Sequence, residues 1–156
     1  KNILLNCIFE AKIINFGLVH IAEDEFNKSS NLTSKLGTLA FMSPEMINES
    51  KYSNKTDVYS YGIFLYVLFI GDLPKQNIND RLLKVPLDFP KNTNNLSEYC
   101  INLIKQCTSF EANQRPSFDE IINDISNHSF SLAPGIDTDI IISRYRSLNR
   151  IRSQKK

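Results

Sequence analysis

The segment of residues 55–70 constrains the fold of this chain more than any other part of its sequence. Its first residues are polar, but from Tyr61 onward it is apolar on every face that a helix would present. A helix that is apolar all round has to be buried, so we expect this one to be the central helix of a domain. Ser53 or Asn54 can cap its start, and Gly71 can end it in a left-handed cap.

Shorter patterns before this segment predict a small sheet, a loop and a further helix. Residues 2–5 and 11–14 are apolar runs joined by a short connection, which is typical of a β-hairpin. Residues 19–42 are largely polar, and a loop of that length in a compact domain is either functional or disordered. Ser43 followed by Pro44 predicts a short helix, because serine is a good cap and proline fits the first helical position.

Helical patterns also follow the central segment. Residues 79–84 form a short amphipathic stretch, and residues 96–108 place their apolar side chains on one stripe of a helix. Ser117 is followed three residues later by Glu120, a capping-box pattern that predicts the start of another helix. Residues 137–151 carry an apolar face at helical spacing and predict a final helix.

The composition indicates one globular domain. The chain has 156 residues, of which 42% are hydrophobic, which is enough for one core, and its longest apolar run is too short to span a bilayer.

The three cysteines, Cys7, Cys100 and Cys107, lack metal-ligand spacing, so we expect buried thiols in a reducing compartment. The sequence has no signal-peptide pattern and does not begin with Met. We therefore expect a cytoplasmic segment of a longer protein.

Positive charge is concentrated in a basic C-terminal tail, residues 131–156, which we expect to be partly helical. Six of the 18 Lys and Arg residues lie there, and no acidic residue follows Asp139, although the net charge of the chain is only +1. Such a tail could touch phosphates or anionic lipid, but its usual role is that of a solvated terminus. We expect no nucleic-acid partner.

Short motifs within residues 1–130 follow a recognisable order. A strand pattern runs into Asn15-Phe16-Gly17, and Gly37-Thr38 and Ser43-Pro44-Glu45 come next. The segment Thr56-Asp57-Val58-Tyr59-Ser60-Tyr61-Gly62 follows, and Arg115-Pro116 ends the series. This order and spacing resemble the C-terminal half of a protein kinase catalytic domain. The resemblance implies a protein-kinase-like fold, present as a C-lobe fragment that is mainly α-helical, with a short N-terminal β-hairpin and a long activation-segment loop.

Two asparagines stand where the resemblance places the magnesium ligands. Asn2 matches the ligand of the second ion, and Asn15 replaces the aspartate of Asp-Phe-Gly. Because Mg²⁺ favours charged oxygens, losing one charge beside it costs several kcal/mol. The catalytic aspartate of the family would lie before Lys1. Catalysis is therefore expected to be impaired or absent, and binding of ATP and Mg²⁺ by the isolated chain is doubtful. Phe16 also fits an ordinary core aromatic, and Gly17 suits the turn that starts the loop.

Residues 18–42 resemble the activation segment of a kinase. The stretch from Gly37 to Glu45 is similar to the Gly-Thr-x-x-Tyr-Met-Ala-Pro-Glu of Ser/Thr kinases, with Phe41 and Ser43 as departures. The resemblance implies that Thr38 faces the catalytic loop and forms part of the platform for a Ser or Thr substrate. Hydroxyl residues, which are common in any polar loop, are the candidate phosphosites: Ser29, Ser30, Thr33 and Ser34.

Four further positions resemble residues that support the kinase fold. Glu45 and Arg115 match the buried ion pair of the family, which has to be kept or lost as a unit because either charge alone is expensive to bury. Asp57 resembles the carboxylate that accepts hydrogen bonds from the catalytic-loop backbone, and Gly62 permits close packing of the central helix.

The subgroup and three hypotheses follow from these motifs. Residues 103–108 and 114–118 resemble the Leu-Ile-x-x-Cys-Trp and Arg-Pro-Ser-Phe stretches of the tyrosine-kinase-like group, with Thr108 in place of the Trp.

The chain is then part of a pseudokinase that serves as a scaffold or allosteric partner, or part of an active Ser/Thr kinase whose N-lobe lies upstream. The third hypothesis is a non-catalytic helical interaction module. The implied partners are a protein substrate or a regulatory protein.

Overall fold

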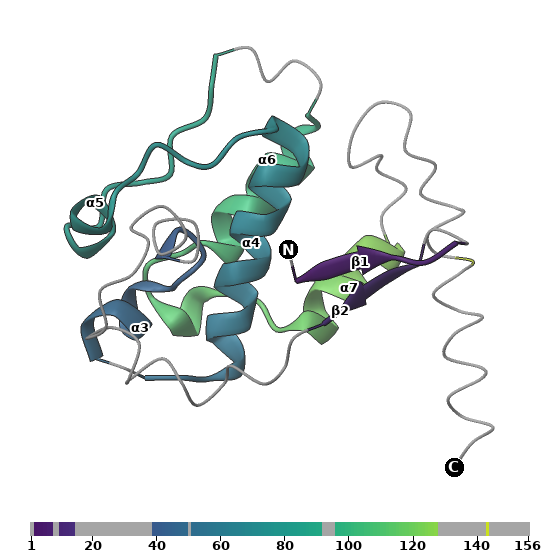
Figure 1. The fold of residues 1–156 in the computed structure, drawn as a ribbon, viewed down its shortest axis with the longest axis horizontal. Helices are drawn as coiled ribbons and strands as arrows, with labels where there is room; N and C mark the ends of the chain where they lie inside the picture. The colour runs from purple at the N-terminus through teal and green to yellow at the C-terminus, as the bar shows by residue number, and fades with distance from the viewer. Residues whose placement is uncertain are drawn as a thin grey trace. The chain divides into compact units, whose positions relative to one another are not determined.

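The computed structural model describes residues 2–7, 10–14, 39–49, 51–91, 96–127 and residue 143. The chain divides into two compact units, residues 1–35 and residues 36–156. The described part of the first unit holds a β-hairpin, and that of the second holds the helices (Figure 1). Most of the predicted loop at 19–42 and, apart from residue 143, the predicted final helix at 137–151 lie outside the described residues.

The predicted hairpin is confirmed. Strand β1 (Ile3–Leu5) pairs antiparallel with β2 (Ala11–Ile13), with Leu4 opposite Lys12. The turn is held by Asn6, whose backbone N–H donates to the Glu10 carbonyl at 3.0 Å and whose side-chain oxygen accepts from the Glu10 N–H at 2.8 Å. The apolar residues of both strands are exposed in this unit, as expected of a two-stranded sheet, which has no second layer of its own.

Helix α4 (Asn54–Ile70) is the predicted central helix, and both of its ends have the predicted caps. The Ser53 hydroxyl accepts from the Lys55 N–H at 3.2 Å, while the Thr56 hydroxyl accepts from the Ser53 N–H at 3.0 Å. Gly71 ends the helix at φ 87°, in the left-handed region that glycine adopts without strain. The sequence predicts that this helix is buried on every face, and this prediction is too broad. Leu68 on α4 is 59% exposed, so one face of the helix is open to solvent.

Helix α4 packs along α6 (Glu98–Cys107), and these two helices form the main core (Figure 1). A Cβ placed on Gly62 would lie 2.7 Å from the Cys107 Cβ and 2.7 Å from the Thr108 Cγ2, so only glycine fits this crossing without a shift. Cys100 and Cys107 are buried as expected, but Cys7 is exposed, because it lies in the hairpin turn. The buried core residues are Val58, Leu65, Tyr66, Cys100, Leu103, Ile104, Cys107 and Ile121.

The remaining helices lie around this pair. Helices α3 (Pro44–Glu49), α5 (Ile78–Leu82) and α7 (Phe118–Asn127) occupy the predicted segments, with a 3-10 turn η2 (Ala112–Gln114) before α7. The predicted capping box of α7 is present: the Glu120 N–H donates to the Ser117 hydroxyl at 3.1 Å, and the Ser117 N–H donates to the Glu120 carboxylate at 2.6 Å. Among the described residues, no helix has both the length and the apolar character needed to cross a bilayer.

Candidate functional site

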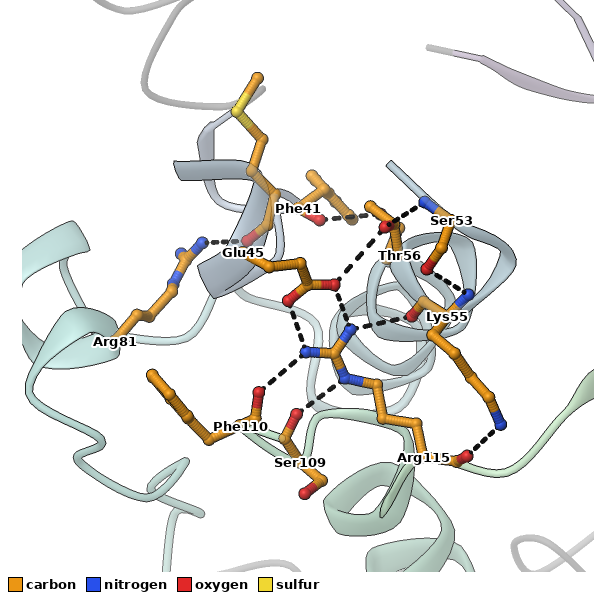
Figure 2. A network of polar contacts seen from close by, with 11 residues as sticks. Phe41, Glu45, Ser53, Lys55, Thr56, Arg81, Ser109, Phe110 and Arg115 are labelled. Atoms are coloured by element: carbon orange, nitrogen blue, oxygen red, sulfur yellow. Dashed lines mark hydrogen bonds and ion pairs between the residues drawn. The ribbon is translucent and has the colours of Figure 1, made fainter. Parts of the chain in front are cut away.

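A bidentate ion pair in the helical unit joins Glu45 on α3 to Arg115, which follows η2. The Arg115 Nη1 lies 2.6 Å from Oε1 of Glu45, and its Nη2 lies 2.8 Å from Oε2 (Figure 2). Arg115 is 1% exposed. The two residues are 70 positions apart in the sequence, so the fold brings them together. A planar guanidinium matches a carboxylate in this two-bond geometry, which an ammonium group cannot reproduce.

The remaining donors of Arg115 bind backbone carbonyls. Its Nε donates to the Ser109 carbonyl at 2.8 Å, its Nη1 to the Lys55 carbonyl at 2.9 Å and its Nη2 to the Phe110 carbonyl at 3.1 Å. A guanidinium has five N–H donors, and here each has an acceptor. In return, the Lys55 ammonium donates to the Arg115 carbonyl. Arg115 therefore ties α3, the start of α4 and the loop after α6 into one network (Figure 2).

Glu45 is held as a carboxylate in this network. Its Oε1 also accepts from the Thr56 hydroxyl at 3.4 Å, which connects it to the capping residue of α4. Burial by itself disfavours the charged form, but the hydrogen bonds and the positive charge of Arg115 outweigh it and lower the pKa of Glu45. The pair is thus ionised at neutral pH, and removing either partner leaves the other as an uncompensated charge.

Hydrogen bonds from two side chains that no sequence motif indicated hold the residues just before α3. Arg81 on α5 is 4% exposed, and its Nη1 donates to the carbonyls of Leu39 at 2.7 Å and Met42 at 3.0 Å. The Ser60 hydroxyl on α4 donates to the Phe41 carbonyl at 2.8 Å. Nothing in the sequence indicated these roles, because Arg81 fits the polar side of a short amphipathic stretch and Ser60 the polar start of a buried helix.

Three of the other predicted site residues lie within the described structure, one in the hairpin unit and two in the helical unit. Asn2 is exposed ahead of β1, and its carbonyl accepts from the Ile14 N–H at 2.9 Å. Asp57 lies exposed in the first turn of α4, and Gly62 faces α6. Several predicted positions lie outside the described residues: Asn15, Phe16, Gly17, Ser29, Ser30, Thr33, Ser34 and Thr38.

Asparagines stand at both positions that are matched to the magnesium ligands of the family. Asn2 is the residue type that kinases use for the second ion, whereas Asn15 carries a neutral amide where a carboxylate is expected. Within the described segments, His, Cys, Asp and Glu side chains form no group of three or more that could hold a metal ion. The set of matched ligands therefore departs from that of an active kinase at residue 15.

Comparison with known proteins establishes the family. The model of the protein kinase domain family matches residues 1–130, so the chain belongs to the protein kinase family. The proteins that it resembles include serine/threonine kinases of Dictyostelium discoideum. A probable serine/threonine-protein kinase is 31% identical over 137 residues, which is 81% of this chain. The RGS domain-containing serine/threonine-protein kinase A is 35% identical over 124 residues, and a probable LIM domain-containing serine/threonine-protein kinase is 33% identical over 141 residues.

This chain is short beside those relatives. The match to the RGS domain-containing kinase includes 78% of this chain, and the match to the LIM domain-containing kinase includes 84% of it. The matched regions are, however, only 8% of the first relative's length, 11% of the RGS domain-containing kinase and 14% of the LIM domain-containing kinase. The predicted resemblance to Ser/Thr protein kinases is confirmed at the level of the family.

Proposed function

We propose that residues 1–130 are part of the C-terminal lobe of a Ser/Thr protein kinase domain of the tyrosine-kinase-like group, whose phosphoryl transfer is disabled at Asn15. The whole protein then acts in signalling as a pseudokinase, a scaffold or allosteric partner for a regulatory protein. We place it in the cytoplasm, in keeping with two buried thiols, Cys100 and Cys107. Residues 131–156 form its basic tail.

The observation that carries the proposal is the complete Glu45–Arg115 network. A buried pair that loses one partner costs about 3–5 kcal/mol, so the fold depends on both partners being present. Both partners and the bound carbonyls are present. The fold is therefore maintained while the metal-ligand position at residue 15 has changed to an amide.

The change at Asn15 is expected to act on the rate of transfer. An aspartate there would place a negative charge beside a divalent cation and a triphosphate, and an asparagine offers one neutral carbonyl oxygen instead. At an effective dielectric constant of about 20, the loss of one charge at contact distance is worth about 4 kcal/mol. A barrier raised by that amount slows the reaction by roughly a thousandfold.

A substrate platform at Thr38 is part of the same proposal. Thr38 directly precedes the segment that Arg81 and Ser60 bind through its carbonyls, so a rigid anchor is available next to it. A protein substrate, or a protein partner that occupies the same surface, would be positioned from this anchor. Phosphorylation of the loop at Ser29, Ser30, Thr33 or Ser34 would add charge ahead of the anchored segment.

The test compares the complete kinase domain with and without Asn15→Asp. Phosphoryl transfer from Mg-ATP to a general protein substrate is measured at saturating ATP. We expect a very slow wild type and a gain on the order of a thousandfold for the variant. The matched control is Asn102→Asp, which makes the same chemical change at an exposed position of α6. Equal and substantial rates for wild type and Asn15→Asp would show an active kinase that tolerates the asparagine.

Nucleotide binding separates the pseudokinase from a helical interaction module. A pseudokinase that retains its N-lobe would still bind ATP, and the binding can be followed by calorimetry in the presence and absence of Mg²⁺. A complete protein that binds no nucleotide in either condition, with Asn15 or with Asp at that position, would instead support the interaction module.

A further inference from the structure

A hollow lies within the helical unit, and Arg81 and Pro44 are part of its lining. It has a volume of about 320 Å³ and is bordered by the start of α3, by α5 with the loop that follows it, and by the end of α6. This volume is enough for one or two side chains of a peptide. Its lining includes Tyr59, Arg81, Lys84, Val85, Lys105 and Phe110.

The lining of this hollow is cationic. Arg81, Lys84 and Lys105 line it, and no carboxylate is among the described residues that do. Lys84 pairs with Glu111 at 2.8 Å, and its ammonium lies 4.5 Å from the centre of the Phe110 ring. The Glu111 carboxylate, half exposed in solvent, offsets one of the three positive charges. The hollow therefore keeps a net positive charge.

Arg81 makes this charge persistent. It is nearly fully buried, and its Nη1 is bound to two backbone carbonyls, which carry no net charge. Its Nε is buried without a hydrogen-bond partner in the part of the chain that the structure describes. No carboxylate of the described residues lies within ion-pair distance of it. A buried cation without an anionic partner raises the affinity of the adjoining surface for negative charge.

Exposed apolar side chains lie at the end of α5, and one of them, Val85, lines the hollow. Val85 is 46% exposed, and its sequence neighbours Leu82 and Leu83 are 38% and 75% exposed. Lys84, between them, has a φ of 59°, which is uncommon for a residue other than glycine. The Gln76 amide donates to the Val85 carbonyl and so fixes the turn. The hydrogen bond from Gln76 therefore holds Val85 in place beside the cationic lining.

We propose that this hollow is a docking site for an acidic peptide segment of a partner protein, with an apolar side chain seated between Val85 and Phe110 and carboxylates facing Lys84 and Lys105. Positive charge beside an apolar concavity is complementary to such a segment. A concave pocket suits a peptide better than a membrane, which needs a protruding or flat basic surface. The site goes beyond the proposed function, because peptide binding here needs neither ATP nor phosphoryl transfer.

The experiment uses the 156-residue chain and a fluorescein-labelled pentapeptide, Asp-Glu-Asp-Leu-Phe, followed by fluorescence polarisation at low and at high salt. Two control peptides separate the contributions: Asn-Gln-Asn-Leu-Phe has less charge, and Asp-Glu-Asp-Ser-Ser has no apolar anchor. We expect saturable binding of the first peptide that weakens with salt, and weaker binding of both controls.

A double variant, Lys84→Gln with Lys105→Gln, tests the site itself. Both lysines are exposed, so the fold should survive, which a thermal unfolding curve in circular dichroism verifies. We expect binding to weaken about tenfold, the combined effect of two surface charges. The control Lys51→Gln removes an exposed lysine outside the hollow and should leave binding unchanged.

Two results would overturn the proposal. One is a double variant that is folded and binds the acidic peptide as tightly as the wild type. The other is binding to phosphatidylserine vesicles that is lost in the double variant, with no binding of any of the three peptides; this would assign the patch to lipid.

Discussion

At the scale of single residues, Arg115 does most to hold the helical unit together. Its five N–H donors bind one carboxylate and three backbone carbonyls. The ion pair with Glu45 could be expected from the resemblance to kinases. The three carbonyls could not, because backbone groups are the same at every position and only the folded loop aims them at the guanidinium.

Arg115→Lys should therefore destabilise the chain strongly. A lysine keeps the charge but cannot form the two-bond contact with Glu45 or reach the three carbonyls, and we expect a loss of about 3–5 kcal/mol in the free energy of unfolding. Urea denaturation of the 156-residue chain measures it. The control Lys51→Gln breaks an exposed ion pair with Glu49 and should cost less than about 1 kcal/mol. A similar small cost for Arg115→Lys would contradict the central role of the network.

Stability should also depend on Glu45 at acid pH. The folded-state pKa of Glu45 is lowered, so its contribution is fully present above the unfolded value of about 4.3 and is lost as the pH falls through the folded pKa. Urea midpoints measured between about pH 6 and pH 3 should fall for the wild type.

Glu45→Gln is the companion experiment to this pH series. The variant has lost the ionisable group and should show a flatter pH dependence at a lower overall stability. Glu98→Gln removes an exposed carboxylate on α6 and controls for the change in net charge. A Glu45→Gln series that runs parallel to the wild type would assign the acid sensitivity to other groups.

At the scale of elements, the start and end of a helix were better predicted than its surroundings. Ser53, Gly71 and Ser117 were expected to cap helices and do so, because capping depends on side chains within a few residues. The contact of α4 with α6 depends on residues far apart in sequence. Gly62 was expected to allow close packing, but only the structure shows that Cys107 and Thr108 are its neighbours.

Gly62→Ala should separate α4 from α6. Alanine favours a helix by about 1 kcal/mol over glycine, but its Cβ would lie 2.7 Å from two side-chain atoms. We expect the overlap to dominate and to cost a net 1–3 kcal/mol, roughly, in urea denaturation. Adding Thr108→Ser removes the Cγ2 methyl and should restore part of the loss. An unchanged or higher stability for Gly62→Ala would mean that the helices shift apart freely.

Ser53→Ala should weaken the start of α4 by about 1 kcal/mol. The alanine cannot accept the hydrogen bond from the Lys55 N–H, whereas the bond from the residue-53 N–H to the Thr56 hydroxyl remains, because the backbone donates it. The loss can be measured as a shift of the thermal midpoint, with Ser53→Asp, which retains an acceptor, as the control that should lose much less.

At the scale of the whole molecule, the family model matches residues 1–130, and the chain consists of a hairpin unit followed in sequence by a helical unit. We expect the isolated 156-residue chain to transfer no phosphate from Mg-ATP and to bind ATP too weakly for calorimetry, since its motifs resemble only the C-terminal half of a kinase domain, and the residues that hold the ATP phosphates in the family belong to the other half. Asn15→Asp should not change this in the isolated chain, in contrast to the gain expected in the complete domain. Saturable micromolar binding of ATP to the isolated chain would contradict the expectation.

The sequence by itself determined the family, the positions of the hairpin and of four helices, and most of the caps, because these depend on periodicity and on residues close in the chain. It also suggested the Glu45–Arg115 pair through resemblance. Only the tertiary structure decided which carbonyls Arg115 binds, that Arg81 is buried against the segment before α3, that Leu68 and Cys7 are exposed, and that three cations line one hollow. Those features depend on contacts between distant segments, and a local pattern carries no record of them.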